Sequence, residues 1–246
     1  MTSPSGKERP FDSWDAIKLL ALFLMFIDHS GHFFFTDEKW LRAIGRGAAP
    51  IFLFLGGFAS SYRFKWDLFA LGVLMTISDI LLTGHPRPQN ILFTILGCRL
   101  IFAWLEKTGR KIKRPWEWYI GSLAMFMTVF FAQYGCFGFL FALSGYFKRR
   151  SKDYPPGLPR RFLITSFVTY GCYTQLFSQF SMPVLLLMIA TLCSVWELLD
   201  QLTLHEIRPN GIPPWLLRAG KLLSYYSGYI YAFHLIVLEW ITHIPF

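Results

Sequence analysis

The residues of this sequence best suited to chemistry follow one stripe of a single apolar segment near the N-terminus. At steps of three or four residues, the stripe runs through Asp15, Lys18, Leu22, Met25, His29 and His32. In an α-helix this spacing places side chains on one face, and Lys18 and His29 would differ by only about 20° around the axis and about 16 Å along it. An imidazole can accept a proton near neutral pH, and Asp28 adjoins His29. The pattern favours a functional His29, whereas Asp15 and Lys18 could instead lie at the edge of the segment with their polar ends in water.

Further ionisable residues lie inside other apolar segments. Asp79, Arg99, His234 and Glu239 each interrupt a run of hydrophobic residues. Charged groups at membrane depth cost a few kcal/mol or more, so they usually face the interior of a helical bundle and mark a site or a pathway. Asp79 and Arg99 could form a structural ion pair between neighbouring helices, or Arg99 could meet an anion that enters from the cytoplasm.

Small residues open the second apolar segment, between Gly45 and Pro50. They permit two helices to approach closely, and Arg46 could pair with Asp28 across that approach. Several neutral polar residues could line the same cavity or simply form hydrogen bonds between helices. These residues are Ser60, Ser61, Asn90, Thr94 and Tyr231.

The elements that carry these residues are predicted to be transmembrane helices. Hydrophobic residues make up 54% of the 246-residue chain and aromatic residues 19%, while only 16% are charged. About 18 to 20 apolar residues in a helix cross a hydrocarbon layer of about 30 Å. The predicted spans are 14–35, 47–63, 66–84, 89–105, 116–133, 135–147, 161–178, 182–199 and 223–243. We therefore expect an all-α integral membrane protein, a polytopic helical bundle of about nine transmembrane helices within a range of about 8–10.

Positive charge is concentrated in the connectors between apolar segments. The net charge is +9, and the largest basic clusters lie within 106–114 and 148–161. Basic connectors face the cytoplasm, which predicts a cytoplasmic N-terminal tail (1–13) before a single transmembrane domain (14–246). The same distribution argues against nucleic-acid binding. Within the last cytoplasmic connector, 213–218 could open a short helix on the membrane face.

Several short stretches together form a recognisable pattern: 15–18 with 25–29, 44–46 with 50–54, 90–94 and, more weakly, 231–235. This pattern resembles the TraX family. The family takes its name from the enzyme that acetylates the N-terminus of conjugative F-type pilin. The resemblance implies a multi-pass protein of the bacterial inner (cytoplasmic) membrane.

The TraX family looks similar to a wider group of transmembrane acyltransferases, which includes the acyltransferase-3 enzymes and the lysosomal heparan glucosaminide acetyltransferase. The resemblance implies transfer of an acyl group, expected to be acetyl, from cytoplasmic acyl-CoA to an amine or hydroxyl acceptor. Acyltransferase-3 enzymes carry an Arg-x10-His pattern in the first helix, and here Lys18 and His29 occupy that spacing. Lysine keeps the charge of arginine but lacks its bidentate fork.

The implied reaction assigns roles to the candidate residues. His29 would be the base, with Asp28 or another carboxylate orienting its ring, although helix neighbours point about 100° apart and Asp28 could bond another helix. The phosphates of acetyl-CoA need cations, for which the candidates are Lys18, Arg46, Arg63, Lys65 and Arg99. Candidates for substrate contact or support are His32, Asp79, Asn90, Thr94 and His234. The expected partners are membrane lipid, acyl-CoA and an acceptor that is pilin or a glycan, and no metal is expected.

Two other functions stay open. A proton-coupled transporter would use the buried charges as a relay, and inverted repeats with broken helices would favour it, neither of which the sequence shows. A non-catalytic assembly factor would use the same charges only for helix packing. It would tolerate substitution of His29 but be sensitive at Gly45, Gly56 and Gly57.

Overall fold

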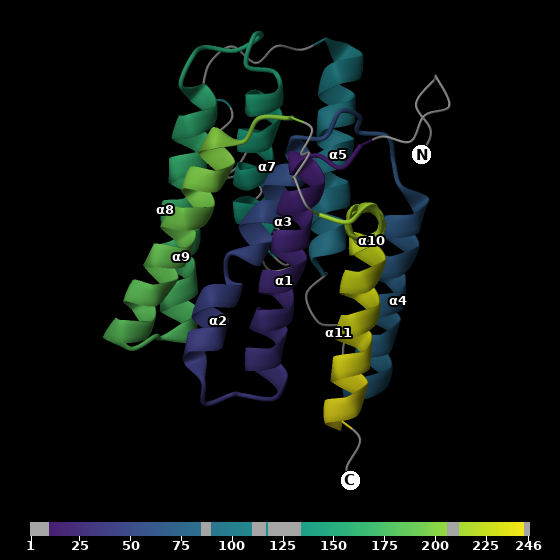
Figure 1. Ribbon diagram of the computed structural model, residues 1–246, viewed down its shortest axis with the longest axis vertical. Coiled ribbons are helices and arrows are strands. Elements are labelled where there is room, and N and C mark those ends of the chain that lie inside the picture. Colours follow the sequence, from purple (N-terminus) through teal and green to yellow (C-terminus); the bar gives the residue numbers. More distant parts are fainter. Residues whose placement is uncertain (1–9, 85–89, 110–116, 118–133, 206–211, 244–246) are drawn as a thin grey trace.

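The computed structural model describes residues 10–84, 90–109, 117, 134–205 and 212–243, and over these residues the chain forms helices and no strand (Figure 1). The helices are α1 (Ser13–Phe33), α2 (Lys39–Gly45), α3 (Ala48–Gly57), α4 (Trp66–Thr83), α5 (Ile91–Thr108), α7 (Gly135–Arg149), α8 (Leu158–Ser178), α9 (Met182–Gln201), α10 (Pro214–Tyr225) and α11 (Ser227–His243). The expected all-α class is confirmed for this part of the chain. Most of the predicted N-terminal tail, residues 1–9, lies outside it.

Helix α1 begins at a reciprocal cap. The Asp12 carboxylate accepts a hydrogen bond from the Asp15 backbone N–H at 3.0 Å, and the Asp15 carboxylate accepts one from the Asp12 N–H at 3.4 Å. This capping box satisfies amide groups that a helix start otherwise leaves without partners. Along the stripe of α1, Asp15, Leu22 and Met25 are buried in the bundle.

Three helices among the described residues are long and apolar enough to cross a membrane: α1, α4 and α9. A bundle of nine spans is therefore not confirmed. Helices α7 and α11 have only 15 and 17 residues, and the predicted span 47–63 is wrong as one continuous helix, because α3 ends at Gly57. The predicted span 116–133 lies outside the described residues except for Glu117.

The break between α2 and α3 follows from local sequence. Pro50 has no N–H, so it cannot donate to the carbonyl of Arg46 four residues earlier, as a continuous helix would require. That carbonyl instead accepts a hydrogen bond from the Tyr170 hydroxyl of α8 at 3.2 Å. This hydrogen bond therefore links the α2–α3 break to α8.

Glycines allow α3 and α7 to touch through their backbones. A Cβ atom added to Gly57 would overlap the carbonyl oxygen of Ala142, and one added to Gly145 would overlap that of Phe54. Small residues permit the same close approach in membrane helices, where packing replaces the hydrophobic effect as the force between helices. Helix α3 is accordingly held deep in the bundle.

Large apolar side chains cover much of the outer surface. The most exposed of them include Phe23, Trp66, Leu81, Leu176, Phe177 and Met182. Monomeric soluble proteins rarely expose apolar patches on this scale, so the surface is suited to lipid. Together with the three candidate spans, this surface indicates a membrane protein.

Positive charge gathers at one end of the bundle. Figure 1 shows the start of α1, the α3–α4 connector (58–65) and the α7–α8 connector (150–157) at the upper end. We call this end, with Arg63, Lys65 and Arg150, the basic end. The α1–α2 turn and the end of α11 lie at the opposite end.

Helix α10 confirms the short helix expected at 213–218, and it crosses the bundle axis near the basic end.

Candidate functional site

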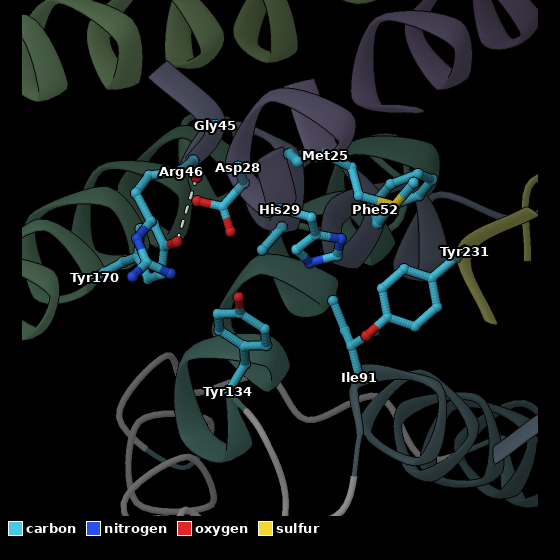
Figure 2. A pocket seen from close by; sticks show the side chains of 12 residues that line it. Met25, Asp28, His29, Gly45, Arg46, Phe52, Ile91, Tyr134, Tyr170 and Tyr231 are labelled. Carbon is cyan, nitrogen blue, oxygen red and sulfur yellow. Dashed lines mark hydrogen bonds between the residues drawn. The ribbon is translucent and has the colours of Figure 1, made fainter. Parts of the chain in front are cut away.

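A small cavity lies in the half of the bundle away from the basic end, between α1, the α2–α3 break, α8, α11 and the starts of α5 and α7 (Figure 2). Its volume is about 40 Å³, enough for two or three water molecules at about 10–15 Å³ each. Its polar lining residues are Asp28, His29, Arg46, Tyr134, Tyr170 and Tyr231. A substrate that enters this space must therefore open it further.

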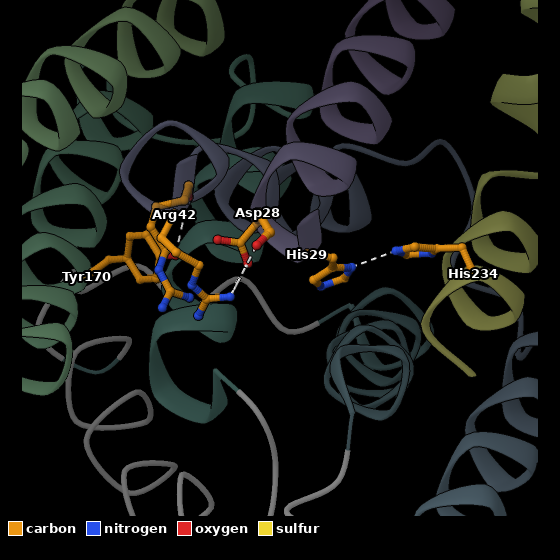
Figure 3. A network of polar contacts seen from close by, with 6 residues as sticks. Asp28, His29, Arg42, Tyr170 and His234 are labelled. Atoms are coloured by element: carbon orange, nitrogen blue, oxygen red, sulfur yellow. Dashed lines mark hydrogen bonds and ion pairs between the residues drawn. The ribbon is translucent and has the colours of Figure 1, made fainter. Parts of the chain in front are cut away.

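Two predicted site histidines meet beside this cavity, although they are 205 residues apart in the chain (Figure 3). The Nδ1 atom of His29 on α1 lies 2.6 Å from Nε2 of His234 on α11. Their rings are nearly parallel, with an interplanar angle of 21° and centroids 4.8 Å apart. His234 in turn places its Nδ1 atom 3.0 Å from the carbonyl oxygen of Ile230, one turn earlier in α11. The contact therefore links α1 to α11, the first and last of the described helices.

The other predicted catalytic residue, Asp28, bonds to a different helix from His29. Its Oδ2 atom lies 3.2 Å from a guanidinium nitrogen of Arg42 on α2 (Figure 3). Burial lowers the pKa of Arg42, and the Asp28 carboxylate opposes that shift. The Oδ1 atom of Asp28 is buried and has no hydrogen-bond partner within the described ranges. Asp28 and His29 therefore face different partners, as neighbours about 100° apart on a helix should.

Gly45 makes this ion pair possible. A Cβ atom at Gly45 would overlap both the backbone and the Cβ of Asp28, so α2 can approach α1 only with glycine at this position. The approach brings Arg42 to Asp28 and places Arg46, one turn further on, at the cavity wall. The Nε atom of Arg46 is buried and lacks a hydrogen-bond partner in the part of the chain that the structure describes.

Replacing Asp28 with asparagine should destabilise the fold, because it leaves Arg42 as a poorly compensated cation. We expect a loss of up to about 3 kcal/mol, below the full range for a completely buried pair because both side chains keep some exposure. The measurement is thermal unfolding in detergent of Asp28→Asn, Arg42→Met and the double variant. Strictly additive losses in this cycle would show that the two residues do not interact.

The remaining predicted cofactor-binding cations do not line the cavity. The Lys18 ammonium donates to the Ser224 carbonyl at the end of α10, at 3.3 Å. The Arg99 guanidinium donates to the carbonyls of Ser61 (2.8 Å) and Arg63 (3.0 Å), and so holds the 58–65 connector. The side chains of Arg63 and Lys65 are exposed at the basic end. Of the five predicted cations, the structure brings only Arg46 to the cavity with His29.

The residues predicted for support are also spread over the bundle. Asn90 caps α5 by accepting from the Leu92 N–H at 3.1 Å, and its amide donates to the Gly72 carbonyl of α4 at 3.0 Å. Thr94 is buried on α5, Asp79 is half-buried on α4, and His32 is exposed near the end of α1. His234 is the member of this group that contacts His29.

Three residues of the site were missed in the sequence: Arg42, Tyr134 and Tyr170. Arg42 carried a usable signal, because it precedes Arg46 by four residues and so shares its helical face. Tyr134 stands immediately before α7 with a φ of 67°, a left-handed conformation that costs a non-glycine residue about 1–3 kcal/mol. Nothing in the local sequence indicated that either tyrosine would reach this cavity.

The fold and the cavity together define a helical membrane protein with a buried polar site of histidine, aspartate, arginine and tyrosine side chains. The family described as TraX protein matches residues 13–206. The chain therefore belongs to the TraX family. This assignment confirms the resemblance seen in the first hundred residues.

Two curated relatives align with shorter parts of the chain. The protein TraX of Escherichia coli (strain K12) is 31% identical over 98 residues, which cover 37% of this chain and 40% of that protein. An uncharacterised protein of Rickettsia prowazekii (strain Madrid E) is 33% identical over 81 residues, which cover 33% of each chain. The chain thus spans less than half the length of the curated relatives it matches. No solved structure matches it significantly.

Proposed function

We propose that this protein is an acyl-CoA-dependent membrane acetyltransferase of the bacterial inner membrane, with its N-terminus in the cytoplasm. The observation that supports the proposal best is one cavity lined by both His29 and Arg46, whose Nε–H has no hydrogen-bond partner among the described residues. A thioester is already activated. Its acyl transfer needs a base for the acceptor, a group that stabilises the oxyanion, and a way to hold both substrates.

In this proposal His29 is the base and Arg46 stabilises the oxyanion. A buried cation with a free N–H is suited to an oxygen that gains negative charge, because the surrounding low dielectric strengthens the interaction. Asp28 keeps Arg42 neutralised, so that the site carries a surplus of positive charge at Arg46.

The donor is expected to bind from the basic end. Exposed cations such as Arg63 and Lys65 would hold the phosphates of acetyl-CoA, since charge-assisted hydrogen bonds to phosphate are strong. The pantetheine arm would then run along α1 toward His29, which lies about 16 Å of helix rise beyond Lys18. An acceptor would approach from the opposite end. Family resemblance implies a pilin N-terminus, and a glycan is the alternative.

Binding of acetyl-CoA to the detergent-purified protein tests the proposal. Lys65→Ala should weaken binding, measured by calorimetry, by about tenfold, the value of one charged hydrogen bond. Lys39→Ala removes the same charge at the opposite end, where Lys39 is also exposed, and should leave the affinity unchanged. Equal effects of the two variants would contradict donor entry at the basic end. No binding of any acyl-CoA by folded wild-type protein would reject the enzyme itself.

A further inference from the structure

We propose that His234 is a positioning residue that holds His29 in a single tautomer, with the proton on Nδ1 and the lone pair on Nε2. The inference rests on the proposed function, in which His29 is the base. In this inference an imidazole of α11 orients the base. A carboxylate does not, because Asp28 forms an ion pair with Arg42.

The argument begins at the carbonyl of Ile230. A carbonyl oxygen can only accept a hydrogen bond, so the Nδ1 atom of His234, 3.0 Å away, must carry a proton. In a neutral imidazole only one ring nitrogen is protonated. The Nε2 atom of His234 is therefore a lone-pair acceptor.

The second step concerns the 2.6 Å contact between His234 Nε2 and His29 Nδ1. Two lone pairs would repel each other at this distance, so one proton must lie between the two nitrogen atoms. Because His234 Nε2 is the acceptor, that proton belongs to His29 Nδ1. Neutral His29 then has its lone pair on Nε2, the nitrogen that must face the acceptor.

The opposite arrangement needs an additional proton. If His234 were an imidazolium, its Nε2–H could donate to His29 Nδ1, and His29 Nε2 would carry the proton and could not act as a base. That state places a second cation beside the cavity that already holds the Arg46 guanidinium. A second positive charge in a partly buried site is unfavourable. The resting protein therefore keeps both His29 and His234 neutral.

The same pair can support the charged step of the reaction. As the acceptor amine or hydroxyl forms its bond to the acyl carbon, its proton moves to His29 Nε2. The carbon–sulfur bond then breaks, CoA leaves as a thiolate, and that proton completes its thiol. While His29 is an imidazolium, its Nδ1–H donates to His234 Nε2, so the positive charge is shared between two rings. The reaction needs no further reactant.

Two substitutions at His234 separate positioning from packing. In His234→Gln the side-chain oxygen can stand where Nε2 stood and still accept from His29 Nδ1–H, whereas His234→Phe keeps a ring but offers no acceptor. We expect kcat for acetyl transfer to fall at least tenfold in His234→Phe and to recover largely in His234→Gln, with an unchanged KM for acetyl-CoA. Wild-type kcat in His234→Phe, or equal losses in both variants, would overturn the inference.

A spectroscopic measurement makes the inference independent of activity. In protein labelled with ¹⁵N-histidine, His29, assigned by comparison with His29→Gln, should show a protonated Nδ1 and a bare Nε2. In His234→Phe the two tautomers of His29 should mix. A wild-type His29 protonated on Nε2 would overturn the inference whether or not acetyl transfer occurs. The expected tautomer without transfer from any acyl-CoA would support the positioning role and reject the proposed function.

Discussion

Replacing His29 with alanine is expected to reduce acetyl transfer by about 100- to 10,000-fold, the usual contribution of a general base. The protein should still fold, because His29 is half-buried at the cavity and its removal leaves the buried stripe of Leu22 and Met25 intact. The measurement is the rate of transfer from radiolabelled acetyl-CoA, with folding checked by size-exclusion chromatography in the same detergent.

His205→Ala is the matched control for this experiment. His205 is an exposed histidine near the basic end, where it contacts Thr203 two residues earlier. Its removal should leave the rate unchanged. A fully active, normally folded His29→Ala protein would reject His29 as the base and favour a non-catalytic assembly factor.

A large loss of stability is expected from Gly145→Ala. The new Cβ would overlap the carbonyl oxygen of Phe54 and lie 2.8 Å from the backbone nitrogen of Phe58. Both are backbone atoms and cannot rotate away, so α3 and α7 must separate. We expect a loss of about 3 kcal/mol or more, at the upper end for overpacking, seen as a lower unfolding temperature and poor recovery of monodisperse protein.

Gly97→Ala provides the comparison for this substitution. Gly97 lies inside α5, and a Cβ there meets no heavy atom within 4 Å. Alanine is the better helix former, so this variant should be as stable as the wild type or up to about 1 kcal/mol more stable. If Gly145→Ala unfolded at the same temperature as Gly97→Ala, the backbone contact between α3 and α7 would not exist as described.

Separation of α3 from α7 should also affect the cavity. The first turn of α3 supplies Ala48 and Ala49 to its wall, and Phe52 follows one turn later. A Gly145→Ala protein that remained folded would therefore be expected to lose activity together with stability. This expectation distinguishes it from His29→Ala, which should lose activity alone.

The stripe along α1 shows which features helical periodicity predicts and which it does not. Spacing alone predicted that Asp15, Leu22, Met25 and His29 share a face, and the first three are buried in the bundle while His29 lines the cavity. It did not predict that Lys18 would bond to the Ser224 carbonyl, because α10 crosses the bundle at that height only in the folded chain.

The second apolar segment shows that an apolar run does not fix where a helix ends. An apolar run over 47–63 predicted one span; α3 begins at Ala48 as expected but ends at Gly57, and Pro50 separates it from α2. Where the freed Arg46 carbonyl would find its partner could not be predicted, since Tyr170 lies 124 residues away.

By itself, the sequence determined that this protein is helical, that its surface is apolar, that basic residues collect in particular connectors, and that His29 lies on the inward stripe of α1. These properties depend on composition and helical period, which are local. Only the tertiary structure decided that His29 meets His234, that Asp28 meets Arg42 rather than Arg46, and that Arg99 holds a connector. Such pairings depend on which helix faces meet and on how closely glycine lets two helices approach. The periodicity of one helix specifies neither of these.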